Sequence, residues 1–137
     1  MLNFSITFKT GIPIYEQVVF AVKKAIVSGQ LKPGDAFPSV RELSRELRIN
    51  PNTAQKVVSH LVNEKLLEIK PGIGSVVTQL PAATEAQRKE LLESEIERLV
   101  VEAKRLLIKK KELLDAISYH WENDKGDSHK KVTVTKK

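Results

Sequence analysis

Apolar side chains recur at the spacing of an amphipathic helix in three successive stretches of the N-terminal half. The first stretch begins at Tyr15 and ends at Gly29, since glycine readily adopts the left-handed conformation that closes many helices. The second follows Ser39, which with Glu42 three residues later has the spacing of a capping box. The third starts at Asn50-Pro51, an N-cap residue followed by proline, and carries the apolar stripe Ala54, Val57, Val58, Leu61 and Val62.

A β-hairpin is predicted after the third helix. Two apolar-rich segments, 66–70 and 75–78, are separated by the four residues Pro71-Gly72-Ile73-Gly74, which favour a turn. Residues 3–8 alternate polar and apolar side chains, which predicts a short strand or an extended arm before the first helix. The predicted fold class is mainly α with a small β-hairpin wing, and residues 1–80 have the element order of a winged helix-turn-helix domain.

Residues 85–122 are dense in Glu, Lys, Arg and Leu and predict two further helices. These helices span 85–107 and 110–122, with a tight turn at Ile108-Lys109. Apolar residues stand four and three apart, as in a coiled coil, and the stripe resumes on a shifted phase in the second helix. One monomer has little surface to cover this stripe, so residues 81–122 are predicted to be the helical dimerisation region of a homodimer. The predicted dimer-interface residues are Leu92, Ile96, Leu99, Leu106, Leu113, Ile117 and Trp121.

Composition excludes several classes of protein. A chain of 137 residues forms one small domain, or one small domain with an appendage. It contains no cysteine and its three histidines lie far apart in sequence, so we expect no metal site. It has neither the ~20 consecutive apolar residues of a membrane helix nor a secretory signal, so a cytoplasmic protein is expected. No nucleophile–base pair or phosphate-binding motif stands out, so we expect no enzyme and no cofactor.

The formal charge of +6 favours polyanionic partners. Residues 1–80 carry ten Lys and Arg against six Asp and Glu, whereas residues 81–122 are almost neutral. Residues 123–137 are polar and basic and predict a disordered tail. The excess positive charge of the first 80 residues is consistent with double-stranded DNA as a partner.

A helix-turn-helix domain inserts the N-terminal part of its second helix into the major groove of DNA. Asparagine and glutamine can each form two hydrogen bonds with adenine, whereas lysine, threonine and serine reach bases or phosphates. An arginine near the start of the preceding helix can reach the DNA backbone, and glycine at a wing tip permits close approach to it. The predicted DNA-binding residues are Arg41, Asn50, Asn52, Thr53, Gln55, Lys56 and Gly72.

These residues also have purely structural alternatives. Asn50-Pro51 starts a helix in any case, and Arg41 can form a surface ion pair with Glu42 or Glu46. His60 is expected to be merely exposed on the same helix face. A functional alternative is a winged-helix module whose basic face binds an acidic protein partner. A face rich in Asn, Gln and Thr weighs against it, because protein interfaces are enriched in aromatic residues.

Five short motifs occur in a characteristic order: 13–17 (PIYEQ), 28–35 (SGQLKPGD), 37–43 (FPSVREL), 50–56 (NPNTAQK) and 70–74 (KPGIG). Together they resemble the DNA-binding domain of the GntR family of transcription regulators, over about residues 10–78. The later segments 102–106 and 111–114 resemble the short two-helix region of the YtrA subfamily.

The resemblance implies that the DNA contacts of the family fall on Arg41, on the polar residues at the start of the third helix, and on Gly72. The sequence departs from many family members, which have arginines where Pro51 and Gln55 stand and a basic residue at Ile73. Members of the subfamily often have glycine in the inter-helix turn near Leu107.

The resemblance further implies a dimeric repressor that binds a palindromic operator and controls a nearby transporter operon. About 40 residues in two helices cannot enclose a metabolite within one subunit, because ligand pockets usually measure several hundred Å³. A small-molecule effector, whose identity the sequence does not give, is therefore expected between subunits or between the two regions of the chain.

Overall fold

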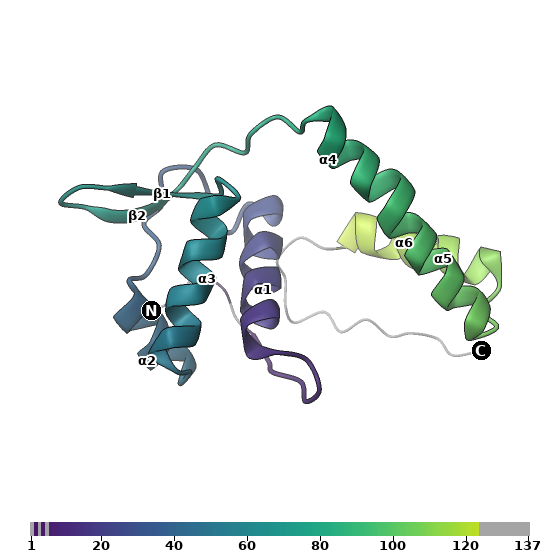
Figure 1. Ribbon diagram of the computed structural model, residues 1–137, viewed down its shortest axis with the longest axis horizontal. Coiled ribbons are helices and arrows are strands. Elements are labelled where there is room, and N and C mark those ends of the chain that lie inside the picture. The colour runs from purple at the N-terminus through teal and green to yellow at the C-terminus, as the bar shows by residue number, and fades with distance from the viewer. Residues whose placement is uncertain (1, 3, 5, 124–137) are drawn as a thin grey trace. The chain divides into compact units, whose positions relative to one another are not determined.

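The computed structural model describes residues 2, 4 and 6–123, which divide into two compact units (Figure 1). The unit that ends at Leu80 contains α1 (Ile14–Ser28), α2 (Val40–Leu47), α3 (Pro51–Asn63), β1 (Leu67–Lys70) and β2 (Gly74–Val77). The second unit, Pro81–Asn123, contains α4 (Glu85–Lys89), the π-helical segment η1 (Glu90–Glu95), α5 (Ile96–Arg105) and α6 (Lys110–Asn123). The predicted fold class, mainly helical with a two-stranded hairpin, is confirmed. The predicted disordered tail lies outside the described residues from position 124 onward.

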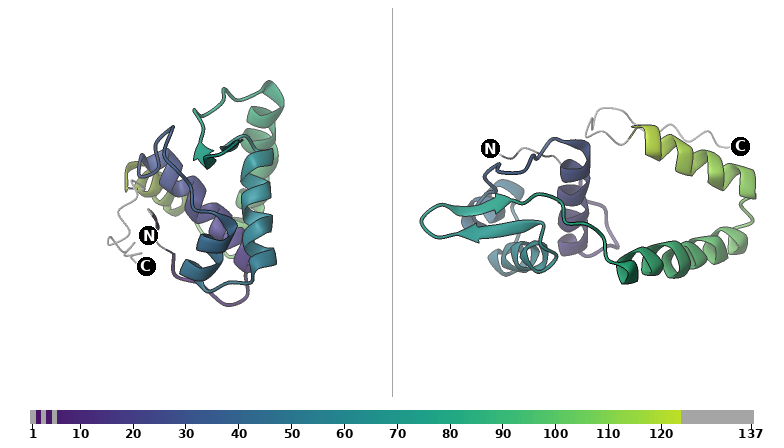
Figure 2. Two further views of the ribbon diagram at one scale, coloured as in Figure 1. Left: turned by 90° about the vertical axis from the view of Figure 1, so that its left-hand side faces the viewer. Right: turned by 90° about the horizontal axis from the view of Figure 1, so that it is seen from above.

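Helix α3 is the central helix of the first unit and packs against both α1 and α2 (Figure 2). Its apolar stripe faces the core, and the side chains of Ala54, Val57 and Leu61 are completely buried. Val22 of α1 and Leu43 of α2 are buried in the same cluster. Because the apolar face of α3 is fixed in this core, its polar face is directed away from the core.

The hairpin of the first unit is antiparallel and pairs Lys70 with Gly74. Three residues connect the strands, whereas the sequence predicted a loop of four. The predicted loop is one residue too long because Gly74 is already the first paired residue of β2. The backbone N–H of Ile73 donates to the carbonyl of Lys70 at 3.0 Å. Pro71 and Gly72, with a φ of 79° at Gly72, occupy the central positions as in a type II turn.

The edge of β2 that does not face β1 pairs with residues 34–37, a segment that the sequence pattern did not predict to be extended. Ala36 forms an isolated antiparallel bridge with Val76. The backbone N–H of Phe37 donates to the carbonyl of Ser75 at 2.9 Å. This pairing attaches the hairpin to the chain just before α2.

The N-terminal arm does not form the strand that was one of its two predicted conformations, since its described residues have no strand assignment. Phe4 is nevertheless buried, and its ring stacks on that of Phe37 with ring centroids 6.1 Å apart. Phe4 therefore completes the core from the N-terminal side of the chain.

The second unit differs from prediction where its first helix ends. The helix stops at Arg105, two residues earlier than predicted, and the turn before α6 begins at Leu106. Leu107 adopts a left-handed conformation with a φ of 61°. The backbone N–H of Ile108 donates to the carbonyl of Ala103 at 2.9 Å, which is a Schellman closure that normally uses glycine.

The π-helical segment η1 is a second departure, because the predicted helix was regular throughout. Hydrogen bonds in a π-helix span five residues instead of four, so the turn is wider. Leu91 and Leu92 both lie in this segment. The two leucines are both exposed within the single chain, at 58% and 57%.

Leu107→Gly is expected to stabilise the second unit by about 0.5–1 kcal/mol, because glycine adopts a positive φ without steric cost. Leu107 is 86% exposed, so its side chain contributes little packing within the chain. Urea unfolding followed by circular dichroism measures the change. Leu107→Ala is the control, since it removes the same side chain but keeps Cβ. A glycine variant that unfolds at lower urea than the alanine variant would contradict the expectation.

Candidate nucleic-acid interface

The predicted DNA-binding residues come from three elements of the first unit. Arg41 is the second residue of α2, and Asn52, Gln55 and Lys56 lie in the first two turns of α3. Since α2 packs against α3, both helix starts belong to one helix-turn-helix. Gly72 lies in the turn between β1 and β2, and this hairpin follows the other end of α3 (Figure 1).

Local hydrogen bonds fix both helix starts. The backbone N–H of Glu42 donates to Ser39 Oγ at 3.1 Å, and that of Ser39 donates to Glu42 Oε1 at 2.9 Å. This predicted capping box lowers the pKa of the Glu42 carboxyl, chiefly through the hydrogen bond from the Ser39 backbone. At α3, the backbone N–H of Asn52 donates to Asn50 Oδ1 at 2.7 Å. Asn50 therefore has a structural role at the helix start, and its side-chain amide N–H groups remain for a ligand.

Most of the predicted contact residues are exposed. The side chain of Arg41 forms no ion pair with any described residue, and Glu42 is occupied by Ser39. Gln55 donates to Ser59 Oγ one turn later, at 3.1 Å, and Thr53 is half-buried. The exposed members of the predicted set are Arg41, Asn50, Asn52, Gln55, Lys56 and Gly72.

Sequence reasoning missed a polar network that joins α1 to the exposed side of α3. The hydroxyl of Tyr15 is 3.0 Å from His60 Nδ1, and the Lys56 ammonium lies 4.8 Å above the Tyr15 ring. His60 Nε2 lies 3.0 Å from Glu64 Oε2. The other carboxylate oxygen of Glu64, Oε1, forms an ion pair with Lys23 Nζ at 2.8 Å. The spacing 56, 60 and 64 could have shown that these three side chains share a helix face. The partners on α1 carry no such signal in the sequence.

This network has a pH dependence. The hydrogen bond from Lys23, followed by its charge and that of His60, lowers the pKa of Glu64 from its ordinary 4.5. A carboxyl whose pKa is lower in the folded state stabilises the fold above its unfolded pKa, and this contribution is lost as the pH falls through the folded pKa. The Glu64 side chain is 41% exposed, so the pair contributes at most about 1 kcal/mol.

Glu64→Gln is accordingly expected to lower the free energy of unfolding at pH 7 by about 0.3–1 kcal/mol. Below the folded pKa of Glu64 the variant and the parent should be equally stable. Urea unfolding across this pH range measures the difference. Glu68→Gln on β1, whose carboxylate forms no ion pair with a described residue, should follow the parent throughout. A constant gap between Glu64→Gln and the parent would contradict the assignment.

The described residues offer neither a metal site nor a membrane span. Among residues 2, 4 and 6–123, no group of three or more His, Asp and Glu side chains could hold a metal ion. Over the same part of the chain, every helix is too short or too polar to cross a bilayer.

The fold and the exposed groups together define a winged helix-turn-helix protein of the kind that binds DNA. The polar start of α3 is exposed next to α2, and a hairpin wing follows α3.

The comparisons with known proteins agree with this class. The family model described as bacterial regulatory proteins, gntR family, matches residues 14–77. The HTH-type transcriptional repressor YtrA of Bacillus subtilis (strain 168) is 32% identical over 96 residues, which cover 69% of this chain and 74% of YtrA. YhcF, an uncharacterized HTH-type transcriptional regulator of the same organism, is 30% identical over 110 residues, covering 80% of this chain and 91% of YhcF. The solved structure of YtrA from Sulfolobus acidocaldarius, a GntR-family transcription factor, is 28% identical with a TM-score of 0.51, covering 87% of this chain and 97% of that chain.

The chain belongs to the GntR family of bacterial regulatory proteins, and it is a DNA-binding transcription regulator and not an enzyme. The matches to the two YtrA proteins agree with the predicted YtrA subfamily.

Proposed function

We propose that the protein is a cytoplasmic homodimeric repressor that binds a palindromic operator through two winged helix-turn-helix units. The relative YtrA of Bacillus subtilis is a transcriptional repressor, which supports the sign of regulation. A twofold dimer places two recognition helices on half-sites one helical turn apart, or multiples of it. The observation that carries the proposal is the apolar surface that the second unit leaves uncovered.

In that unit, Ala103 is the only buried residue among the described ones. Large apolar side chains along α5 and α6 are exposed instead, and Trp121 has 82% of its surface accessible. A helical surface of this kind is stable in water only when another apolar surface covers it. A second copy offers the same stripe, and self-pairing would bury it at ~25 cal/mol per Å² of apolar area. Of the predicted interface set, Leu92, Ile96, Leu99, Leu106, Ile117 and Trp121 are exposed, and Leu113 is half-buried.

Within each first unit, we assign base contacts to Asn52 and Gln55 and a phosphate contact to Arg41. Amide side chains can form paired hydrogen bonds with adenine, and an arginine that forms no ion pair with a described residue can bind phosphate. Asn50, Thr53 and Lys56 flank these residues on α3, and Gly72 allows the wing turn to approach the sugar-phosphate backbone.

The regulated genes are proposed to include a nearby transporter operon. A further relative, MngR of Escherichia coli (strain K12), is a mannosyl-D-glycerate transport/metabolism system repressor and is 33% identical over 67 residues. Transcript levels of the neighbouring genes in a deletion strain test this part of the proposal. Unchanged levels would remove the transporter assignment and leave DNA binding untouched.

Arg41→Ala is expected to weaken operator binding at all sequences and to reduce the slope of log affinity against log salt by about 1 per subunit. Asn52→Ala should instead change the preference among operators, by about 1–3 kcal/mol at the base pair that it contacts. Mobility-shift titrations with the gene's own upstream DNA at two salt concentrations measure both effects.

The matched control for these substitutions is Arg88→Ala, which removes an exposed arginine from α4 of the second unit. It should change neither the affinity nor the salt slope. If Arg41→Ala behaves like Arg88→Ala, Arg41 does not contact phosphate. If the parent protein shows no preference for its upstream DNA over bulk competitor, the proposed function itself is wrong.

A further inference from the structure

The N-terminal arm and α1 line a cavity within the first unit. Two contacts hold the arm in place: the Phe4 ring stacked on Phe37, and hydrogen bonds from Gln17 of α1. Gln17 accepts from the backbone N–H of Lys9 at 2.8 Å and donates to the carbonyls of Lys9 and Ile12 at 2.9 and 2.8 Å. One side chain thus bonds three backbone groups of the segment between the arm and α1, which fixes this side of the cavity.

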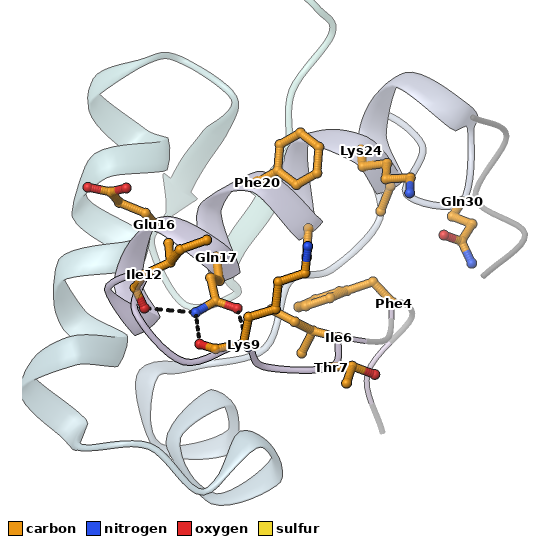
Figure 3. A pocket seen from close by; sticks show the side chains of 12 residues that line it. Phe4, Ile6, Thr7, Lys9, Ile12, Glu16, Gln17, Phe20, Lys24 and Gln30 are labelled. Carbon is orange, nitrogen blue, oxygen red and sulfur yellow. Dashed lines mark hydrogen bonds between the residues drawn. The ribbon is translucent and has the colours of Figure 1, made fainter. Parts of the chain in front are cut away.

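The cavity between these two attachments measures about 480 Å³. Its walls are mainly apolar, with Phe4 and Ile6 on the arm and Phe20 on α1 (Figure 3). Phe20 is 63% exposed, a large apolar ring on a helix surface that no described side chain covers. Pockets that bind small organic molecules usually measure about 300–1,000 Å³ and have such apolar walls with a few polar groups.

The charged groups of the cavity are unevenly placed. Lys9 and Lys24 line it, and neither ammonium has an ion-pair partner among the residues that the structure describes. Glu16, the one carboxylate among the described residues of the lining, lies at the Ile12 end and points away from Lys24 (Figure 3). The part of the cavity near Lys24 therefore combines an apolar wall with uncompensated positive charge.

We propose that this cavity binds a small amphipathic anion, with an aromatic or aliphatic body against Phe4, Ile6 and Phe20 and a carboxylate at Lys24 and Lys9. The site lies within one winged helix-turn-helix unit, so it needs neither a second subunit nor the helical region. It does not depend on the proposed operator or on dimerisation. The volume of about 480 Å³ and the apolar walls fit a small molecule.

The test uses three probes with one aromatic body and different charges: 1-naphthoate, neutral 1-naphthamide and cationic 1-naphthylmethylammonium. Each is titrated into the full chain, and backbone amide shifts in nitrogen–proton NMR spectra locate the site and give the dissociation constant. Saturable shifts are expected in residues 6–30, and naphthoate should bind about ten-fold more tightly than naphthamide. Equal affinity of the anion and the amide, or tighter binding of the cation, would overturn the anion assignment.

Variants separate this cavity from other apolar surfaces. Lys24→Gln should weaken naphthoate about five-fold or more and leave naphthamide unchanged, whereas Glu16→Gln should bind naphthoate as well as the parent or better. Phe20→Ala should weaken both ligands. Val27→Ala removes another exposed apolar side chain of α1, 67% exposed and outside the cavity, and should change neither. Shifts confined to residues 85–123, or a Lys24→Gln variant that binds like the parent, would overturn the proposal.

Discussion

Leu99→Lys is expected to give a monomer at micromolar concentration and to weaken operator binding about 100-fold or more. Leu99 lies in the middle of α5 and is 40% exposed in the single chain, among the apolar side chains of the proposed dimer surface. A lysine there would place a charge in a desolvated apolar contact, which costs several kcal/mol on each side of a twofold interface. Without the dimer, each recognition helix binds its half-site alone and the gain from linked binding is lost.

Light scattering coupled to size exclusion measures the mass, and a mobility-shift titration measures the affinity. Leu99→Met keeps the apolar volume and should remain dimeric. Glu97→Lys introduces the same charge two residues away, on another side of the helix, and should also remain dimeric. A Leu99→Lys protein with the mass of a dimer would show that α5 does not form the subunit interface. A parent protein that is already monomeric would refute the homodimer.

The sequence was sufficient wherever structure depends on neighbours along the chain. The capping box at Ser39 and the asparagine cap of α3 involve residues two or three positions apart, and both are present as predicted. The element order of the first unit could also be predicted from local sequence, since each apolar stripe shows which face of its helix or strand is buried. The fold class could therefore be predicted from periodicity and caps alone.

Contacts between distant segments were not predictable in this way. Segment 34–37 has no strand pattern in the sequence, yet it pairs with the edge of β2 that β1 leaves open. The contact of Tyr15 with His60 joins residues 45 positions apart. Neither pairing has a periodic signal, since it depends on how the elements pack.

The prediction that the first helix of the second unit ends at residue 107 was wrong for a different reason. The stop at Arg105 depends on a leucine in a left-handed conformation, which residue preferences disfavour. The phase shift of the apolar stripe indicated a turn before residue 110, but it gave no sign that the helix ends as early as Arg105. For the candidate DNA contacts, the sequence supplied residue types and helix face, while the structure adds that Asn50 is occupied as a cap and that Lys56 lies over Tyr15.

Leu61→Ala is expected to lower the free energy of unfolding by about 2–5 kcal/mol, the range measured for truncating buried leucines. Leu61 lies in the last turns of α3 and has no exposed surface. Its removal leaves a cavity in the core that fixes the same helix whose polar face is proposed to contact DNA. In a unit of about 80 residues, such a loss lowers the melting temperature by roughly 10 °C or more.

Thermal and urea unfolding monitored by circular dichroism measure this loss. Ile73→Ala truncates an apolar side chain that is 71% exposed in the wing turn, and its stability should stay within about 0.5 kcal/mol of the parent. Because Leu61 and the proposed dimer surface belong to different compact units, Leu61→Ala should retain the mass of the parent, in contrast to Leu99→Lys. A Leu61→Ala protein as stable as Ile73→Ala would show that α3 is not fixed by this core, and the presentation of its polar face would then need another explanation.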